Sequence, residues 1–261
     1  MISGVDLSVL YGSSSSGGIS GGNPVLALTQ AEKNQTKQIA AEAKKPEVQR
    51  DLAAFRKAVA SAKDVKSLLA NPAAQKVLLT ANGLSDQIGS TGLVTKALMS
   101  KTSDPKSLAN LLPNTAWKAA AATYDFANKG LKVLKDPKVL DTVASAYAEI
   151  SWRKSLDTTT PGLSDALTFR ETAAKAKNAD DILGDPVLRR VVTTTLGIPQ
   201  EIAYQSLDAQ EKAINSKVDV KQFKNKDFVE AFAKRYLVAA ASAGQASSAS
   251  PAGLQAYGLV V

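Results

Sequence analysis

Apolar positions recur at helical spacing from Thr29 onward. On one segment, Val48, Leu52, Phe55 and Val59 follow one another at steps of four, three and four, so they form one apolar stripe. Alternation of apolar and polar residues with a period of two is nearly absent, and β-branched residues are not concentrated as strands require. The chain is therefore predicted to be all-α, built from many short helices.

Local signals predict where several of these helices begin and end. A capping side chain followed by proline predicts the starts of four helices, at Asn71-Pro72, Asp104-Pro105, Asp136-Pro137 and Asp185-Pro186. Thr29 and Glu32 fit a capping box, which predicts that the first helix begins at Thr29. Gly83 and Gly197 predict the ends of the helices that begin at Pro72 and Pro186.

The strongest pattern in the chain is an internal repeat. Residues 55–72 read FRKAVASAKDVKSLLANP and residues 169–186 read FRETAAKAKNADDILGDP, in one register with an offset of 114. In this register Phe55 matches Phe169. After a small gap in the alignment, a helix that begins at Trp117 is expected to parallel one that begins at Phe228. The repeat predicts two similar modules of short helices joined by a helical bridge.

We expect five parts along the chain. They are a flexible N-terminal arm at 1–24, a first helical module at 25–126, a helical bridge at 127–165, a second helical module at 166–240 and a flexible C-terminal arm at 241–261. Both arms are rich in Gly and Ser, a composition that cannot bury enough apolar surface to order itself. Two readings of the arms stay open, plain tails or segments that become ordered on a partner or a neighbouring copy.

Candidate partner-binding residues are the apolar residues of the two arms and one tryptophan. The arm residues are Val5, Leu7, Leu10, Tyr11, Leu254, Tyr257 and Leu259. Trp152 has no counterpart in the repeat and precedes Arg153-Lys154, so we expect it to be exposed. Trp117 is instead expected to pack in the core.

Composition excludes several kinds of chemistry. The chain has no Cys and no His, which removes the usual zinc and iron–sulfur ligands, Cys nucleophiles and Ser-His-Asp triads. No metal site and no cofactor are expected. Acid–base chemistry would need paired carboxylates, and one predicted helix carries three, Glu201, Asp208 and Glu211. Carboxylates in a row on one helix usually form a solvent-exposed face. We therefore expect no catalytic residue, no small-molecule substrate and no enzymatic activity. An enzyme that uses Lys, Tyr or carboxylate side chains stays open as an alternative to the non-enzymatic functions given below.

Charge and hydropathy limit the partners. The net charge is +8, but the basic residues are spread among acidic ones, so no nucleic acid partner is expected. No apolar run is long enough to span a bilayer, so no membrane insertion is expected. The first residues lack the features of a cleaved signal peptide, so any export would use a route without one.

The repeated Phe-Arg and Pro motifs and the segment LGIPQEIAYQSLDAQEKAINSKVDVKQFKNKDFVEAFAKRYL at 196–237 resemble a bacterial family with a domain of unknown function. The resemblance covers roughly residues 30–240. Members of that family often carry the domain in tandem copies and are encoded among flagellar genes. The resemblance implies a link to the bacterial flagellum through gene neighbourhood. Together with the lack of catalytic motifs, it leads us to expect a non-enzymatic structural or assembly protein of the flagellum, whose partners are other flagellar proteins or copies of itself. The alternative is a soluble cytoplasmic regulator or export chaperone of flagellar subunits.

Overall fold

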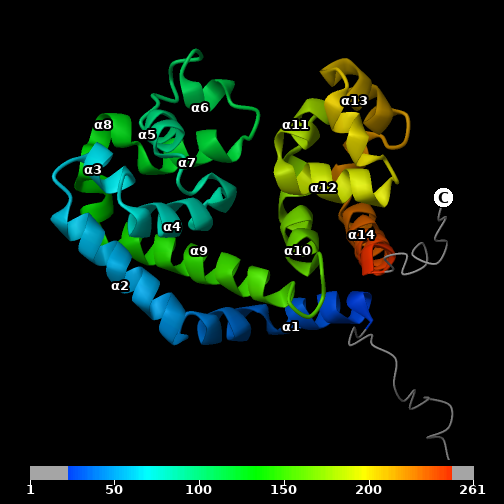
Figure 1. Ribbon diagram of the computed structural model, residues 1–261, viewed down its shortest axis with the longest axis horizontal. Coiled ribbons are helices and arrows are strands. Elements are labelled where there is room, and N and C mark those ends of the chain that lie inside the picture. The colour runs from blue at the N-terminus through cyan, green and yellow to red at the C-terminus, as the bar shows by residue number, and fades with distance from the viewer. Residues whose placement is uncertain (1–22, 249–261) are drawn as a thin grey trace, which may run out of the picture.

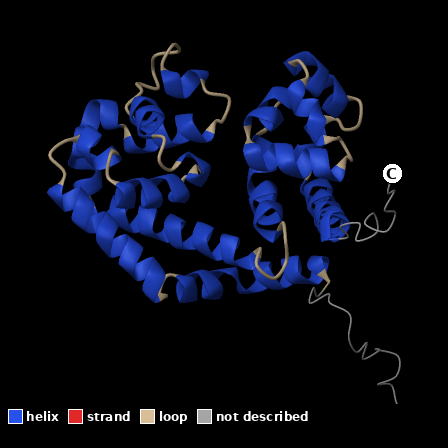
Figure 2. Cartoon of the chain, in the orientation of Figure 1, coloured by secondary structure: helices blue, strands red, loops and turns tan. Residues whose placement is uncertain are grey.

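The computed structural model describes residues 23–248, which fold into helices and turns without a β-strand (Figure 2). The all-α prediction is therefore confirmed. The α-helices are α1 (Pro24–Glu42), α2 (Pro46–Ser61), α3 (Val65–Leu69), α4 (Pro72–Ala81), α5 (Thr91–Leu98), α6 (Leu108–Leu111), α7 (Ala116–Tyr124), α8 (Phe126–Lys129), α9 (Pro137–Leu156), α10 (Leu163–Thr172), α11 (Ala179–Gly184), α12 (Pro186–Thr195), α13 (Leu207–Asn215) and α14 (Lys226–Ser248). Short 3-10 helices join them at η2 (Ser85–Gln87), η3 (Gly130–Lys135), η4 (Ala173–Lys175), η5 (Gln200–Tyr204) and η6 (Val220–Lys224).

The helices form two lobes (Figure 1). We call α2 to α9 the first lobe and α10 to α14 the second lobe; α1, α2 and α9 make a base along one side of the molecule. Each lobe has its own hydrophobic core. The two cores meet along α9, because Tyr147 and Ala148 belong to the first core whereas Trp152 belongs to the second.

The first helix begins earlier than the capping box predicts. Asn23 caps α1 by accepting hydrogen bonds from the backbone N–H groups of Val25 and Leu26, so the helix begins at Pro24. Thr29 lies inside the helix and donates its hydroxyl to the Val25 carbonyl. An Asn-Pro pair supplies both a cap and a fixed first-turn φ, and it overrides the weaker signal downstream.

The start of α1 packs against the second lobe, whereas the sequence predicts that it belongs to the first module. Leu28 and Ala31 are buried in the core of the second lobe, although residues 25–126 were expected to form the first module. The second lobe thus includes a helix from the other end of the chain.

Two short helices at corresponding places have matching ends. Asn71 and Asp185 cap α4 and α12, and each helix begins with the predicted proline. Both helices stop at a glycine with positive φ, Gly83 at 71° and Gly197 at 58°. The next residue in each case donates its N–H to a carbonyl five positions back, Leu84 to Leu79 and Ile198 to Thr193. This is the Schellman arrangement, so the predicted helix ends are confirmed.

The cores are centred on the two phenylalanines of the repeat. Phe55 is 1% exposed in the first lobe and Phe169 is 0% exposed in the second. Phe169 stacks on Phe232 at 5.3 Å between ring centroids and meets Phe223 edge-on at 5.5 Å. Truncation of either phenylalanine would therefore leave a large cavity and lower the free energy of unfolding.

A polar contact ties three helices of the first lobe together. Asp51 of α2 accepts a hydrogen bond from the Lys76 ammonium of α4 at 2.7 Å. It accepts another from the Tyr147 hydroxyl of α9 at 2.6 Å. One carboxylate thus fixes the long helix α9 against the pair α2 and α4.

The second lobe has the same arrangement. Asp165 of α10 accepts hydrogen bonds from the Arg190 guanidinium of α12 at 2.7 Å and from the Tyr236 hydroxyl of α14 at 2.9 Å. Asp165 and Arg190 lie 114 positions after the aspartate and lysine of the first lobe. The third partner again comes from the long helix that covers the other two.

We expect Phe55→Ala and Phe169→Ala each to lower the free energy of unfolding by about 3–5 kcal/mol, because each removes a buried ring. Denaturant unfolding followed by circular dichroism measures the loss. Leu111→Ala, at a side chain 65% exposed, is the control and is expected to change stability by less than about 0.5 kcal/mol. A near-zero loss at either phenylalanine would contradict its place in the core.

We also expect Asp51→Asn to destabilise the protein by about 1–2 kcal/mol at neutral pH. Burial opposes the ionised form of Asp51, but the hydrogen bonds from Lys76 and Tyr147 outweigh it and lower its pKa below the usual 3.8. A carboxylate with a lowered pKa stabilises the fold above its unfolded-state pKa, and this contribution disappears as the pH falls through the folded-state value.

The difference in stability between Asp51→Asn and wild type should therefore shrink as the pH is lowered from 7 to 3. Denaturant melts across this range measure it, with Asp141→Asn at an exposed position of α9 as the control. A difference that stays constant with pH would show that the charge of Asp51 is not involved.

Candidate functional site

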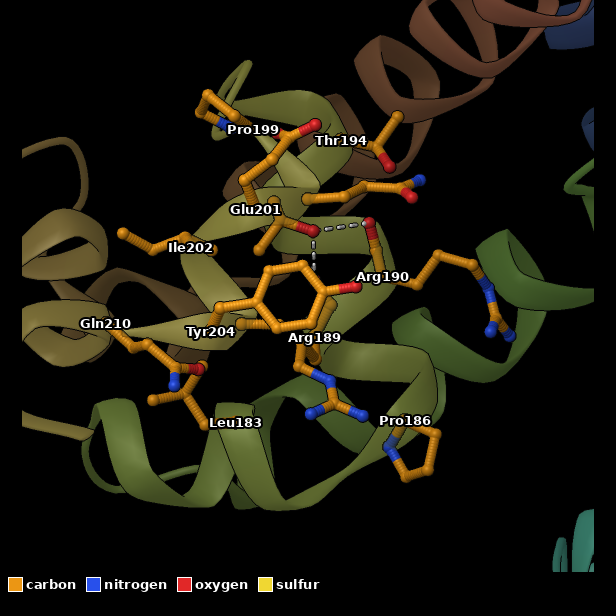
Figure 3. Close-up of a pocket in the computed structure, with 13 residues that line it drawn as sticks. Leu183, Pro186, Arg189, Arg190, Thr194, Pro199, Glu201, Ile202, Tyr204 and Gln210 are labelled. Carbon is orange, nitrogen blue, oxygen red and sulfur yellow. Dashed lines mark hydrogen bonds between the residues drawn. The ribbon is translucent and has the colours of Figure 1, made fainter. Parts of the chain in front are cut away.

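The second lobe has a groove of ≈ 480 Å³ between α12, η5 and the start of α13. The inner face of α12, with Leu188, Val191 and Val192, is buried in the core, so its outer face is left to line the groove. Pro199 precedes η5, which carries the opposite wall. Figure 3 shows the lining side chains from these elements.

Two side chains give the groove its chemical character. Tyr204 lines it from η5 with 92% of its surface exposed, which is unusual for a large aromatic residue. Arg189 lines it from α12 and is also exposed. Among residues 23–248, no carboxylate lies within ion-pair distance of Arg189. The groove thus presents an aromatic face, a guanidinium and apolar side chains such as Ile202.

Two neighbouring polar side chains are engaged within the protein, whereas the exposed Glu201 carboxylate also lines the groove and forms no ion pair within residues 23–248. The Arg190 guanidinium extends away from the groove and pairs with Asp165 (Figure 3). The Thr193 hydroxyl donates to the Arg189 carbonyl at 2.8 Å. This arrangement favours binding of a ligand that brings an acceptor to Arg189 and an apolar group to Tyr204.

The corresponding place in the first lobe is closed. Gln75 lies 114 positions before Arg189 and is 2% exposed. Its amide nitrogen donates to the Leu69 carbonyl at 2.6 Å and to the Thr91 hydroxyl at 2.9 Å. Its amide oxygen accepts from the Gly89 N–H at 2.8 Å. The buried Gln75 amide therefore holds the loop that contains Gly89 against α4. At the aligned position, the second lobe has the exposed Arg189 instead.

A second groove, of ≈ 440 Å³, lies between the lobes, with α7 on one side and η4, α11 and α12 on the other. Its carboxylates have internal roles, because Asp185 caps α12 and Asp181 accepts from the Lys177 N–H at 2.8 Å. The lobes approach closely nearby, since a Cβ at Gly184 would lie 2.3 Å from the Pro113 carbonyl oxygen. The groove with Tyr204 is the stronger candidate, because the Arg189 guanidinium forms no ion pair within residues 23–248.

The prediction that Trp152 is exposed is wrong. Trp152 is 3% exposed and its indole N–H donates to the Gln38 side chain of α1 at 3.0 Å. The next residue, Arg153, is also buried, between the carboxylates of Glu149 and Glu171. Helices α1 and α10 cover this end of α9, so a basic neighbour in sequence did not indicate a surface position.

The other predicted partner-binding residues lie outside the described residues. They are Val5, Leu7, Leu10, Tyr11, Leu254, Tyr257 and Leu259.

The three carboxylates considered for acid–base chemistry do not share a helix. Glu201 lies in η5, whereas Asp208 and Glu211 lie in α13. A hydrogen bond with Asp180 raises the pKa of Glu211. Within residues 23–248, no group of three or more acidic side chains is placed to hold a metal ion. No helix in this range is long and apolar enough to cross a membrane.

A family model described as "Protein of unknown function (DUF1217)" matches residues 81–229. The chain belongs to the DUF1217 family. The expected membership in a family of unknown function is thus confirmed, over a shorter range than the resemblance suggested. The match includes α12, η5 and α13, so the groove lies within the part of the chain that defines the family.

A crystal structure of protein AGR_C_984 from Agrobacterium tumefaciens has a similar fold. It superposes with a TM-score of 0.68 at 21% sequence identity, covering 86% of this chain and 96% of that one. At this identity the likeness concerns the fold alone. No curated protein matches the chain.

Neither Arg189 nor Tyr204 stood out in the sequence. Arg189 is the first of two adjacent arginines on an amphipathic helix, and Tyr204 is a single aromatic residue in a polar segment. One signal was present in the repeat, where a glutamine at position 75 aligns with an arginine at position 189. The change from an amide to a cation at this aligned pair indicated that the two positions have different surroundings.

We expect Tyr204→Ala to change the free energy of unfolding by less than about 0.5 kcal/mol, because the ring buries little surface. Tyr124→Ala, at a buried tyrosine that accepts a hydrogen bond from Asn82, is expected to cost about 3–5 kcal/mol. Denaturant melts of both variants measure the contrast. A large loss at Tyr204 would mean that its ring supports the fold.

Proposed function

We propose that this DUF1217 protein is a non-enzymatic protein that acts through protein–protein contacts in the bacterial flagellum. The observation that carries the proposal is the open groove with Tyr204 and Arg189. Tyr and Arg are enriched among the residues that dominate binding energy at protein interfaces. The flagellar association is supported by the resemblance of the sequence to a family encoded among flagellar genes.

We infer further that the two lobes are copies of one helical unit, so that the protein offers two related surfaces to its partners. The inference is supported by the offset of 114, which is common to the capped helices α4 and α12 and to the aspartates of the two polar contacts. The long helices α9 and α14 take the same part in each unit. Tyr147 follows the cap Asp136 by eleven residues, and Tyr236 follows the cap Asn225 by eleven.

This pairing replaces the expected one between a helix at Trp117 and a helix at Phe228. Residues 101–129, with α6, α7 and α8, are then an addition to the first unit, and α9 closes that unit in addition to joining the lobes. Because the exposed Tyr204 ring and the Arg189 guanidinium without a carboxylate partner share a groove of the second unit, we propose that partner contacts concentrate there.

The location is tested by cross-linking mass spectrometry on isolated flagellar basal bodies and filaments. Cross-links between this protein and flagellar subunits are expected, with groove residues of the second lobe among them. If the protein is absent from these assemblies and cross-links only to unexported subunits in the cytoplasm, the role as regulator or export chaperone replaces the structural one.

We expect deletion of residues 1–22 or 249–261 to leave the melting temperature within about 2 °C of wild type. Ordering each residue costs about 1–2 kcal/mol, whereas burying a Leu or Val returns about 1.5–3 kcal/mol, so the few apolar arm residues cannot order these segments unaided. The same deletions should weaken association with partners or with further copies.

Calorimetry and sedimentation velocity measure the two effects. Unfolding of the truncated protein would show that the arms belong to the fold. If truncation alters neither stability nor association, the arms are plain tails.

A further inference from the structure

We propose that the groove of the second lobe binds the N-terminal segment Val5–Tyr11 of a second copy of this chain. The inference deepens the proposed function, on which it rests, by naming the segment and the surface that meet. It starts from Tyr204 and Arg189, which share the groove. The Tyr204 ring is 92% exposed, and within residues 23–248 no carboxylate pairs with Arg189, so neither side chain has a binding counterpart there.

The first lobe indicates what the groove lacks. There, Gln75 satisfies its amide on three groups of its own lobe and the space is closed. At the aligned position, the Arg189 side chain carries hydrogen-bond donors and no acceptor, so it cannot repeat the bond that Gln75 accepts from the Gly89 N–H. An occupant that pairs with the guanidinium brings acceptor oxygens to it, and a carboxylate is the strongest such group.

The chain itself contains one segment of that chemistry outside the described residues. Asp6 is the only charged side chain among residues 2–22, and it stands between Val5 and Leu7, with Tyr11 following. The apolar residues suit the ring of Tyr204 and the aliphatic lining of the groove. The C-terminal segment 249–261 is equally apolar but has no acidic side chain, so charge complementarity selects the N-terminal segment.

The position of α1 favours docking between copies over docking within one chain. Figure 1 places α1 at one end of the second lobe and α12 with α13 toward the other, with α10 and α14 between them.

Twelve Cα–Cα steps lie between Tyr11 and Asn23, which reach roughly 40 Å when fully extended, and a Gly-rich chain of this length spans roughly 17–21 Å on average. Because α1 and the groove lie at opposite ends of the lobe in Figure 1, docking within one chain would require an extended linker, so the groove of a neighbouring copy is the more accessible one. Because segment and groove are different surfaces, the contact is head-to-tail and can extend from copy to copy.

The test uses the full-length protein and a fluorescent peptide of residues 4–12 (GVDLSVLYG), with binding followed by anisotropy. We expect saturable binding that falls about tenfold with Arg189→Glu and at least about tenfold with Tyr204→Ala. A peptide with Asp6→Lys should bind wild type weakly and should regain affinity for the Arg189→Glu variant. Arg56→Glu, at an exposed arginine of the first lobe, is the matched control and should leave binding unchanged.

Absence of peptide binding, or binding that ignores both Arg189→Glu and the reversed charge on the peptide, would overturn the proposal. Disulfide cross-linking tests whether the bound segment comes from the same chain or from a second copy. The chain has no cysteine, so the introduced cysteines are the only thiols. Ser8→Cys and Gln200→Cys in separate chains should yield a disulfide between positions 8 and 200 on mixing.

If the disulfide forms only when both substitutions are in one chain, the segment docks on its own lobe and the proposed contact between copies is wrong. The inference can also be separated from the flagellar role. Peptide binding that depends on Arg189, in a protein absent from flagellar assemblies, would leave this contact standing and remove the proposed location.

Discussion

Short helices must be covered, and this requirement shapes both lobes. Helices of five to ten residues, such as α3, α4, α11 and α12, are below the length at which an isolated helix is stable in water. In each lobe a long helix packs over a central short one, α9 over α4 in the first lobe and α14 over α12 in the second, and α3 and α11 pack in turn on α4 and α12. Asp51 and Asp165 fix that packing, because each accepts hydrogen bonds from a cation on a short helix and a tyrosine on the long one.

The two lobes share this framework but use the positions 75 and 189 differently. In the first lobe, Gln75 is buried and uses its amide for hydrogen bonds within the lobe. In the second, Arg189 is exposed and lines a groove with Tyr204. The proposed contact with another segment depends on this difference between an internally bonded amide and an exposed cation.

The ends of the chain connect the lobes to each other and to any partner. Helix α1 leaves the first lobe and inserts Leu28 and Ala31 into the second core, while the Trp152 end of α9 enters the same core from the other direction. Arg170 of α10 pairs with Glu32 of α1 and with Glu230 of α14, so charges as well as apolar contacts join these helices. The first described residues therefore lie at the lobe that carries the groove.

The sequence by itself determined the features that depend on neighbours within a few residues. Asn and Asp before proline specified the starts of α4, α9 and α12, Gly83 and Gly197 specified two helix ends, and the helical spacing around Phe55 specified a buried face. Only the tertiary structure decided which long helix covers which short ones, that Trp152 is buried, and that Arg189 and Tyr204 share a groove. These outcomes depend on contacts between helices far apart in the chain, where the free energy of packing overrides local preference.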